Sequence, residues 1–340
     1  MGPVQPTLRT EYLTNTLTGP HGLYEHALGD RPRRHLGYTT DDNARALVVL
    51  TRGFPDVDTR PYLEFVARGR TEGGWHNRMT EEGRWADVRG SDDAHGRAIW
   101  GLGCALRSPY ADRARRVLLS GLDLDSHHPR ANAYAGLGAT EAIEAAPDLT
   151  GVNDFLQRVA SRLPGPTLPL QSQEWAWPEP RLSYDNARIP QALMAAGRAL
   201  GDGGMIADGL RLLEWLIGVE RGTSGFSFTP VAGRGPESSD SSTRAPEFDQ
   251  QPIEAWAMAD ACLLASEIER DDRWVDALED AAMWVMGRND TGAVLYDAAT
   301  GAGFDGLESD GVNQNRGAES TLAVLGALDA LRMHQESRVG

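Results

Sequence analysis

Two of the alanine- and leucine-rich runs in this 340-residue chain open with an adjacent pair of aspartates, Asp41 with Asp42 and Asp92 with Asp93. A single aspartate before such a run normally caps a helix, because its side chain accepts hydrogen bonds from free backbone N–H groups. A cap needs one acid, so the doubling indicates a second use. Neighbouring carboxyl groups acquire different pKa values, which suits general acid and base catalysis.

Further hydrogen-bonding side chains gather at the starts of similar runs. Three arginines, Arg45, Arg97 and Arg188, follow an aspartate by three or four residues, so each pair shares one helix face. Each arginine has two interpretations: a salt bridge that orients the aspartate, or a clamp for a sugar carboxylate or phosphate. The other polar candidates at these starts are Asn43, His95, Asp185, Asp249, Gln250, Gln251, Asn313, Asn315 and Glu319.

Several aromatic side chains lie in predicted loops or at helix starts, outside the apolar stripes of helices, where they are available as sugar-stacking platforms. They are Trp75, His76, Trp175, Trp177 and Tyr184. A cleft that combines carboxylates, amides and loop aromatics suits a carbohydrate ligand.

Composition excludes several function classes. All 33 basic side chains are arginine, so a Schiff-base lysine and a P-loop are excluded, and the formal charge of -16 disfavours nucleic acid and anionic membranes as partners. Cys104 and Cys262 lie in apolar runs, and the histidines have no metal-binding spacing. We therefore expect no metal and no cofactor. Without a secretory signal or a long apolar run, the sequence favours a cytoplasmic protein.

The elements that position these residues are predicted to be helices. Six small-residue runs, starting near residues 42, 93, 132, 185, 249 and 319, alternate with amphipathic runs that have one polar face. Six inner and about six outer helices predict an all-α fold, a single (α/α)6 toroid domain over residues 1–340. Residues 7–18 are the candidate for the sixth outer helix. Long loops are expected at 73–89, 164–183 and 222–247, the first as a candidate for a short β-hairpin.

In such a toroid the inner helices run parallel, so their N-terminal ends meet at one mouth and form a polar pocket. The motifs that begin these helices, in order along residues 22–331, resemble those of a bacterial six-hairpin glycosidase-like family whose members are often associated with glycosyltransferases. The motifs are TDDNARAL (40–47), GSDD (90–93), GRA (96–98), YDNAR (184–188), FDQQPIEA (248–255) and NRGAESTL (315–322). The resemblance implies the (α/α)6 fold, a sugar-related role and a possible association with a glycosyltransferase.

The leading hypothesis is a glycosidase that cleaves an oligosaccharide. Asp42 and Asp249 are the predicted acid and base, Asp41 and Asp93 tune their pKa values, and the across-ring placement of Asp249 predicts inversion of the anomeric centre. The remaining candidates named above, with Asp92, are predicted to bind substrate. The alternatives are a phosphorylase that uses the arginines, an epimerase with His95 as its base, and a non-catalytic sugar-binding or scaffolding partner of a glycosyltransferase.

Overall fold

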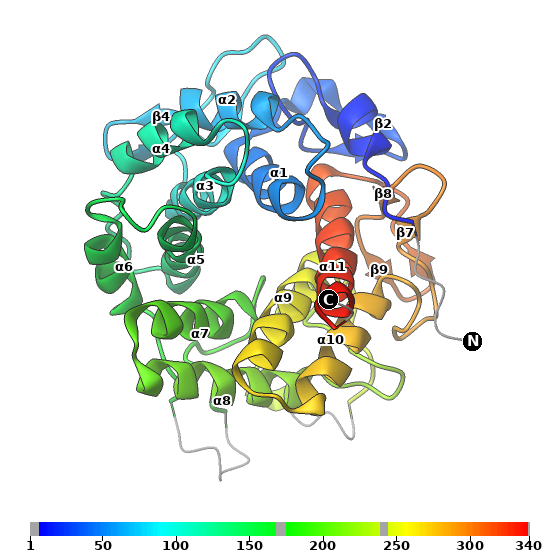
Figure 1. Cartoon of the computed structure of the whole chain (residues 1–340). Coiled ribbons are helices and arrows are strands. Elements are labelled where there is room, and N and C mark those ends of the chain that lie inside the picture. Colours follow the sequence, from blue (N-terminus) through cyan, green and yellow to red (C-terminus); the bar gives the residue numbers. More distant parts are fainter. Residues whose placement is uncertain (1–6, 168–174, 239–243, 339–340) are drawn as a thin grey trace.

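The computed structural model describes residues 7–167, 175–238 and 244–338, and Figure 1 shows their helices arranged in two concentric rings. This arrangement confirms the predicted all-α (α/α)6 toroid. The inner ring consists of α1 (Thr40–Gly53), α3 (Asp92–Ala105), α5 (Pro129–Ala145), α7 (Arg188–Leu200), α9 (Pro252–Ile268) and α11 (Ala318–Ser337). The outer ring contains α2 (Arg60–Arg68), α4 (Ala111–Ser120), α6 (Val152–Ala160), α8 (Gly203–Glu220) and α10 (Asp272–Trp284).

The connections at the rim of the ring carry short antiparallel strand pairs. The pairs are β1 (Ala27–Leu28) with β2 (Arg31–Pro32), β3 (Tyr38–Thr39) with β6 (Arg78–Met79), β4 (Arg70–Thr71) with β5 (Gly74–Trp75), β7 (Tyr296–Asp297) with β8 (Ala302–Gly303), and β9 (Leu307–Glu308) with β10 (Gly311–Val312). Within residues 73–89, where a short hairpin was expected, β5 and β6 pair with strands that precede this segment, and Met79 and Trp85 form an antiparallel bridge across the turn at residues 80–83. Short helical turns also form at Arg34–Leu36 and Pro236–Ser238.

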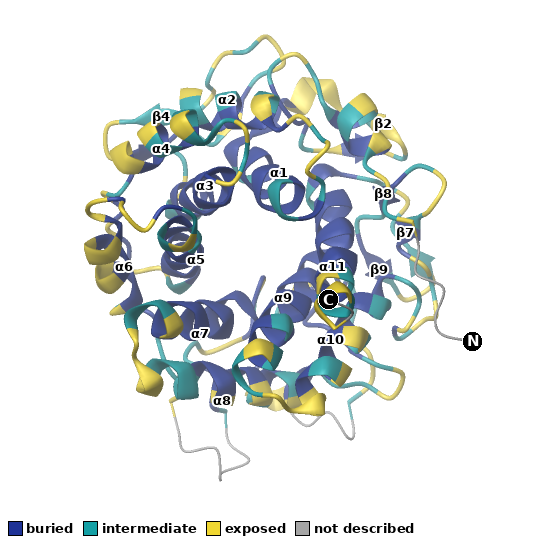
Figure 2. Ribbon diagram, viewed as in Figure 1, coloured by how far each residue is buried: buried dark blue, intermediate teal, exposed yellow. Residues whose placement is uncertain are grey.

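Inner and outer helices differ in burial as their sequences predict. Figure 2 shows the inner helices mostly buried and the outer helices with exposed outward faces. Small residues let the inner helices approach closely: a Cβ added at Gly103 of α3 would lie 2.2 Å from the carbonyl oxygen of Gly138 on α5. The predicted core cysteines, Cys104 and Cys262, are buried and free. No helix in the described ranges is long and apolar enough to cross a membrane.

The ring closes where α11 packs against α1, and the N-terminal segment covers this junction from outside. Residues predicted to form a sixth outer helix make only a short helical turn, Leu13–Leu17, which contacts α11. Leu13 and Leu17 are fully buried there, and the hydroxyl of Tyr12 donates a hydrogen bond to the carbonyl oxygen of Arg316 at 3.1 Å. The two ends of the chain thus share one hydrophobic core.

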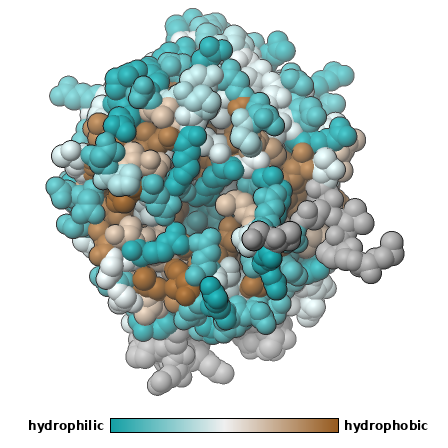
Figure 3. All heavy atoms as spheres, viewed as in Figure 1, coloured by the Kyte–Doolittle hydropathy of each residue, from teal (hydrophilic) through white to brown (hydrophobic). Residues whose placement is uncertain are grey.

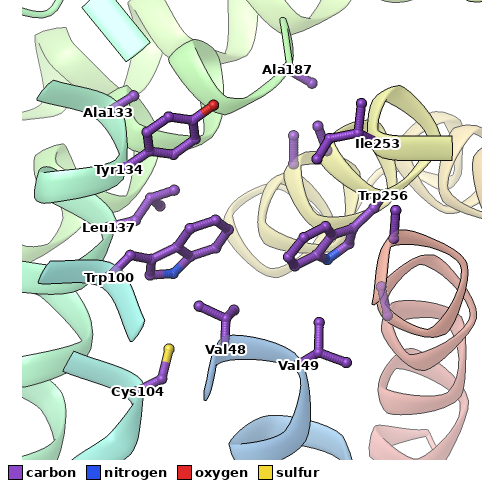
Figure 4. Close-up of a cluster of buried hydrophobic side chains, with 14 of the residues drawn as sticks. Val48, Val49, Trp100, Cys104, Ala133, Tyr134, Leu137, Ala187, Ile253 and Trp256 are labelled. Atoms are coloured by element: carbon purple, nitrogen blue, oxygen red, sulfur yellow. The ribbon is translucent and has the colours of Figure 1, made fainter. Parts of the chain in front are cut away.

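Large side chains fill the middle of the ring. Trp100 of α3 and Trp256 of α9 lie near each other in Figure 4, with ring centroids 5.7 Å apart. The guanidinium carbon of Arg188, from α7, lies 4.7 and 4.4 Å from the two ring centroids. These three side chains therefore form a plug across the toroid, which we call the central plug.

Cavities lie on both sides of the central plug. The smaller one, about 340 Å³, is at the C-terminal ends of the inner helices, where arginines and glutamates such as Arg52, Glu141 and Arg198 line it. Figure 3 shows that hydrophilic residues surround the middle of the face turned to the viewer. Arg52 of α1 donates to Glu141 of α5, and Arg198 of α7 pairs with Glu144 of α5 and Glu267 of α9, so these charges tie inner helices together.

Candidate active site at the N-terminal ends of the inner helices

The larger cavity, about 1030 Å³, lies at the N-terminal ends of the inner helices, where the parallel arrangement predicts a polar pocket. The first turns of α1, α3, α9 and α11 contribute, and residues just ahead of α5 and α7 complete the ring. The lining consists of Glu25, His26, Thr39, Asp41, Asp42, Arg45, Arg89, Gly90, Ser91, Asp92, Asp93, Arg97, Asp125, His128, Tyr184, Gln251, Ile253, Asp305, Gly317, Glu319 and Ser320.

Asp42 is the buried member of the first aspartate pair. Its carboxylate accepts hydrogen bonds from the Thr39 hydroxyl at 2.7 Å and from the Arg45 guanidinium at 2.9 Å. Burial, with the nearby charges of Glu319 and Glu25, raises its pKa to about 7, although Arg45 and Thr39 act in the opposite direction. Asp42 is therefore able to hold a proton near neutral pH, which a general acid requires.

Asp41, its neighbour on α1, has the opposite electrostatic environment. Its two carboxylate oxygens accept hydrogen bonds from Arg97 at 3.1 Å and from the Asn77 amide at 2.9 Å. Burial acts to raise its pKa, but Arg97, Arg45 and these hydrogen bonds lower the pKa below its ordinary value. Two adjacent carboxyl groups with pKa values shifted in opposite directions are the arrangement by which enzymes separate an acid from a base.

The second pair, Asp92 and Asp93, faces the same cavity from α3. Asp93 accepts a hydrogen bond from the hydroxyl of Tyr184 and lies 3.9 Å from Arg97. Tyr184 is 44% exposed, and the guanidinium carbon of Arg130 lies 4.8 Å from its ring centroid. The aromatic ring lining this cavity is thus anchored at its hydroxyl and accessible to a ligand.

The lining arginines are already engaged by carboxylates. Arg45 bonds to Asp42 and, at 2.6 Å, to Glu319, which joins α1 to α11. Arg97 pairs with Asp41, as described above, and Arg89 pairs with Asp92 at 3.2 Å. Of the two interpretations offered for arginines at helix starts, the structure supports the salt bridge.

The tryptophans expected as sugar platforms are instead part of the packing, and this prediction was wrong for them. Trp75 is fully buried, donates to the Val66 carbonyl and packs against His95. Trp177 is 1% exposed and Trp175 packs edge-on against Trp215. Trp75 contacts α2 and α3 through Val66 and His95, and Trp175 and Trp177 pack against Trp215 of α8, so these indoles belong to the packing of the helices.

His76 and His95 also lie outside the cavity lining. His76 stacks on Trp85, with Nδ1 3.2 Å from Asp87. His95 is 1% exposed, its Nε2 lies 2.9 Å from the Gly121 carbonyl oxygen, and burial lowers its pKa. The expected epimerase base therefore has no access to a ligand here.

Other predicted binding residues hold loops and helices in place. Asn43 accepts from the Leu23 amide and donates to the Thr39 carbonyl. Asp185 accepts from Tyr134, and Arg188 belongs to the central plug. Three further residues also have structural contacts. Gln250 is fully buried and accepts from the Phe228 amide, Asn313 donates to Glu308, and Asn315 accepts from the Gly29 amide.

Asp249, the expected partner of Asp42, does not line the cavity. Its Oδ1 is buried without a hydrogen-bond partner in the described structure, and a Cβ added at Gly306 would lie 2.2 Å from it. Burial and the charges of Glu308 and Asp305 raise its pKa to about 6. The structure therefore does not bring Asp42 and Asp249 together across the cavity.

Sequence reasoning missed more than half of the lining, which includes Glu25, His26, Thr39, Arg89, Asp125, His128 and Asp305. Thr39, Ser91 and His128 are the residues immediately before α1, α3 and α5, so the rule that helix starts converge should have included them. Asp305 carried no such signal, because it reaches α11 from a loop and caps it, accepting from the Gly317 amide at 2.6 Å.

The central plug forms the base of the cavity. Along α3, Arg97 lines the cavity, Trp100 belongs to the plug, and Arg107 follows α3 and lines the smaller cavity beyond. The same order holds on α9 for Ile253, Trp256 and Asp260. A ligand must therefore enter and leave through the N-terminal mouth. Within the described residues, no group of three or more histidine, cysteine, aspartate or glutamate side chains is placed to hold a metal ion.

Comparison with known proteins finds solved structures of the same fold. No family model and no curated protein matches the sequence. Among solved structures, a sugar epimerase from a ruminal bacterium matches with a TM-score of 0.68 and 12% identity, over 95% of this chain and 97% of that one. The cellulase Cel9M of C. cellulolyticum, in complex with cellobiose, has a TM-score of 0.61 and 9% identity over 92% and 88%.

An α-1,6-mannanase of Salegentibacter in complex with α-1,6-mannotetrose gives a TM-score of 0.62 and 13% identity over 95% and 96%. That structure is of an inactive variant in which alanine replaces two consecutive aspartates. These comparisons lend no support to an association with a glycosyltransferase. The chain therefore has the six-hairpin (α/α)6 fold that carbohydrate epimerases and glycoside hydrolases share.

Proposed function

We propose that this protein is a glycoside hydrolase whose catalytic carboxyl groups are Asp41 and Asp42. The observation that carries the proposal is their opposite pKa shift at the wall of one polar cavity. Asp42, with its raised pKa, protonates the glycosidic oxygen as the bond to the anomeric carbon breaks. Asp41, held ionised by Arg97, accepts a proton from the water whose oxygen bonds to that carbon.

The α-1,6-mannanase supports this assignment. Its inactive variant lacks two consecutive aspartates, and consecutive aspartates open α1 and α3 in this chain. We assign the second pair, Asp92 and Asp93, to substrate binding. Tyr184 and Gln251 complete the binding surface, with Tyr184 as the stacking platform.

The expected inversion of configuration depended on Asp249 facing Asp42 across the ring. Since Asp249 lies outside the cavity lining, that argument no longer applies to the Asp41 and Asp42 pair. Proton NMR of the first anomer released, before mutarotation, gives the stereochemistry directly.

Turnover of a glycan panel by the wild type and by Asp42→Asn tests the proposal. The amide retains the size of the carboxyl group but cannot donate its proton to the leaving oxygen, so we expect activity to fall by about 100-fold or more. Asp249→Asn is the matched control, because it makes the same change beside the cavity. A variant Asp42→Asn that retains activity within tenfold of the wild type, or an effect of Asp249→Asn equal to that of Asp42→Asn, contradicts the assignment.

An epimerase is the second candidate, because the sugar epimerase aligns with a higher TM-score than either hydrolase and two histidines, His26 and His128, line the cavity. Epimerisation leaves the glycosidic bond intact and exchanges a carbon-bound proton with solvent. Incubation of reducing sugars in D₂O, followed by NMR, detects that exchange. Binding of a glycan without hydrolysis or exchange would instead identify a sugar-binding protein.

A further inference from the structure

We infer that the cavity takes an uncharged glycan and rejects anionic sugars and inorganic phosphate, an inference that rests on the proposed function for the identity of the reaction. The cavity lining carries eight carboxylates and three arginines, so its charge is strongly negative near neutral pH even with Asp42 protonated. An anion entering it is repelled at short range, where burial weakens screening by solvent.

Arg45 and Arg97 do not offset this repulsion, because a more exposed carboxylate covers each of these two guanidinium groups. Glu319 is the clearest case: its side chain is 39% exposed, whereas that of Arg45 is 6% exposed, and the two groups are 2.6 Å apart. Glu319 therefore occupies the position that a sugar carboxylate or a phosphate oxygen would need. Asp41 engages Arg97 in the same way at 3.1 Å. The third lining arginine, Arg89, is 53% exposed, and its charge is paired with that of Asp92 at 3.2 Å.

The helix N-termini, which often bind anions, are also occupied by groups of the protein. The side chains of Thr39 and Ser91 accept amide hydrogens in the first turns of α1 and α3, and Asp305 accepts the amide ahead of α11. The first residues of α5 and α9 are Pro129 and Pro252, which have no N–H group to donate. At the start of each of these five inner helices, one backbone N–H group is thus either bonded to a side chain of the protein or absent.

The groups that remain available in the cavity, carboxylates and an aromatic ring, suit an uncharged glycan. Carboxylates are acceptors, so they pair with the many hydroxyl donors of a sugar, and the exposed ring of Tyr184 offers a surface for the apolar face of a pyranose. Without a phosphate site, the attacking molecule is water and the reaction is hydrolysis. A phosphorylase, one alternative considered from the sequence, is therefore not supported.

Isothermal titration of the full chain with inorganic phosphate and with glucuronate at pH 7 tests the inference independently of the natural substrate. We expect no saturable binding to the wild type. Glu319→Gln uncovers Arg45, and we expect this variant to bind phosphate saturably, at least about tenfold more tightly than the weakest affinity the wild-type titration would detect. The control is Glu336→Gln, which removes the same charge from the other end of α11, 3.7 Å from Arg332, and is expected to bind no more phosphate than the wild type.

Saturable phosphate binding to the wild-type cavity overturns the inference, and so does an unchanged affinity in Glu319→Gln. Turnover assays with matched neutral and uronate oligosaccharides extend the test. Cleavage of a uronate at the rate of its neutral counterpart, or a requirement for phosphate, also overturns it. Failure to cleave or epimerise any glycan contradicts the proposed function instead, while the phosphate titrations still decide whether the cavity excludes anions.

Discussion

Asp42 and Asp41 show how neighbouring side chains of one type acquire different properties from their surroundings. Asp42 lies among the charges of Glu319 and Glu25, and Asp41 lies against Arg97. The difference does not come from position along the chain, because both residues belong to the first turn of α1. It comes from the side chains that α3, α11 and the segment just before β1 place beside each carboxyl group.

The pH dependence of catalysis follows from these pKa shifts. Asp42 must be protonated to act as the acid, so kcat/KM should fall as the pH rises through about 7. Asp41, whose pKa is lowered, stays ionised throughout this pH range. Glu319→Gln removes a charge that raises the pKa of Asp42, so the alkaline limb should move to lower pH. Measured kcat/KM profiles check this, and a limb near pH 6 that moves in Asp249→Asn would identify Asp249 as the acid instead.

The stability of the folded protein should depend on the same group. The pKa of Asp42 is raised on folding from 3.8 to about 7, so the native state binds the proton more tightly and the contribution of Asp42 to stability declines as the pH rises from about 4 to 7. Asp42→Asn removes this dependence. Urea denaturation should show the stability of the variant rising relative to the wild type across that range, and a constant difference would contradict the raised pKa.

At the scale of elements, the site depends on close contact between inner helices. Gly103 and Gly138 allow the backbones of α3 and α5 to touch, and Gly96 of α3 lies equally close to Ala131 of α5. This contact brings Asp93 on α3 near Tyr184, which precedes α7. The small residues of these helices therefore serve the geometry of the cavity as well as the packing.

Gly103→Ala should destabilise the protein by about 1 to 3 kcal/mol, because the added methyl group would overlap the carbonyl oxygen of Gly138. The matched control is Gly218→Ala in α8, where nothing lies within 4 Å of the added Cβ. Alanine there should stabilise the helix by about 0.5 to 1 kcal/mol. Urea denaturation of both variants checks the prediction, and similar effects at the two positions would show that backbone contact does not limit the packing of α3 on α5.

At the scale of the whole molecule, the closed ring predicts that residues 1–340 unfold as one domain. The N-terminal turn packs on α11, and α11 packs on α1, so opening the ring at any helix pair exposes a shared core. The proposed single domain should give one cooperative transition, with near-UV and far-UV circular dichroism changing together in denaturant. Two separate transitions would divide the chain into independent units.

The closure itself is tested by Leu13→Ala, because Leu13 is fully buried under the junction of the chain ends. The cavity left by the change should cost about 2 to 5 kcal/mol and lower the midpoint of the same single transition. Leu119→Ala, on the outer helix α4 where the side chain is 41% exposed, is the control and should have a much smaller effect. Equal losses at the two positions would mean that the N-terminal turn does not hold the ring closed.

The sequence by itself determined the helices, their inner or outer position and the end of the ring that carries the polar residues. These properties depend on local periodicity and on capping residues, and the six runs begin within a few residues of the observed starts of α1, α3, α5, α7, α9 and α11. The helix starts therefore predict that Asp41, Asp42, Asp92 and Asp93 lie together at one mouth of the ring, and all four line the cavity there. Their neighbours on the same helices, Arg45 and Arg97, followed from helical spacing.

The tertiary structure decided which of the remaining polar and aromatic residues face the cavity. Trp75 and Trp177 lie in the core and Asp249 lies outside the cavity lining, because the direction of a loop side chain depends on segments far away in the sequence. Asp305 and Glu25 entered the site from such segments. The tertiary structure also decided the protonation of Asp42, since burial and the charge of Glu319 arise only when α1 and α11 meet.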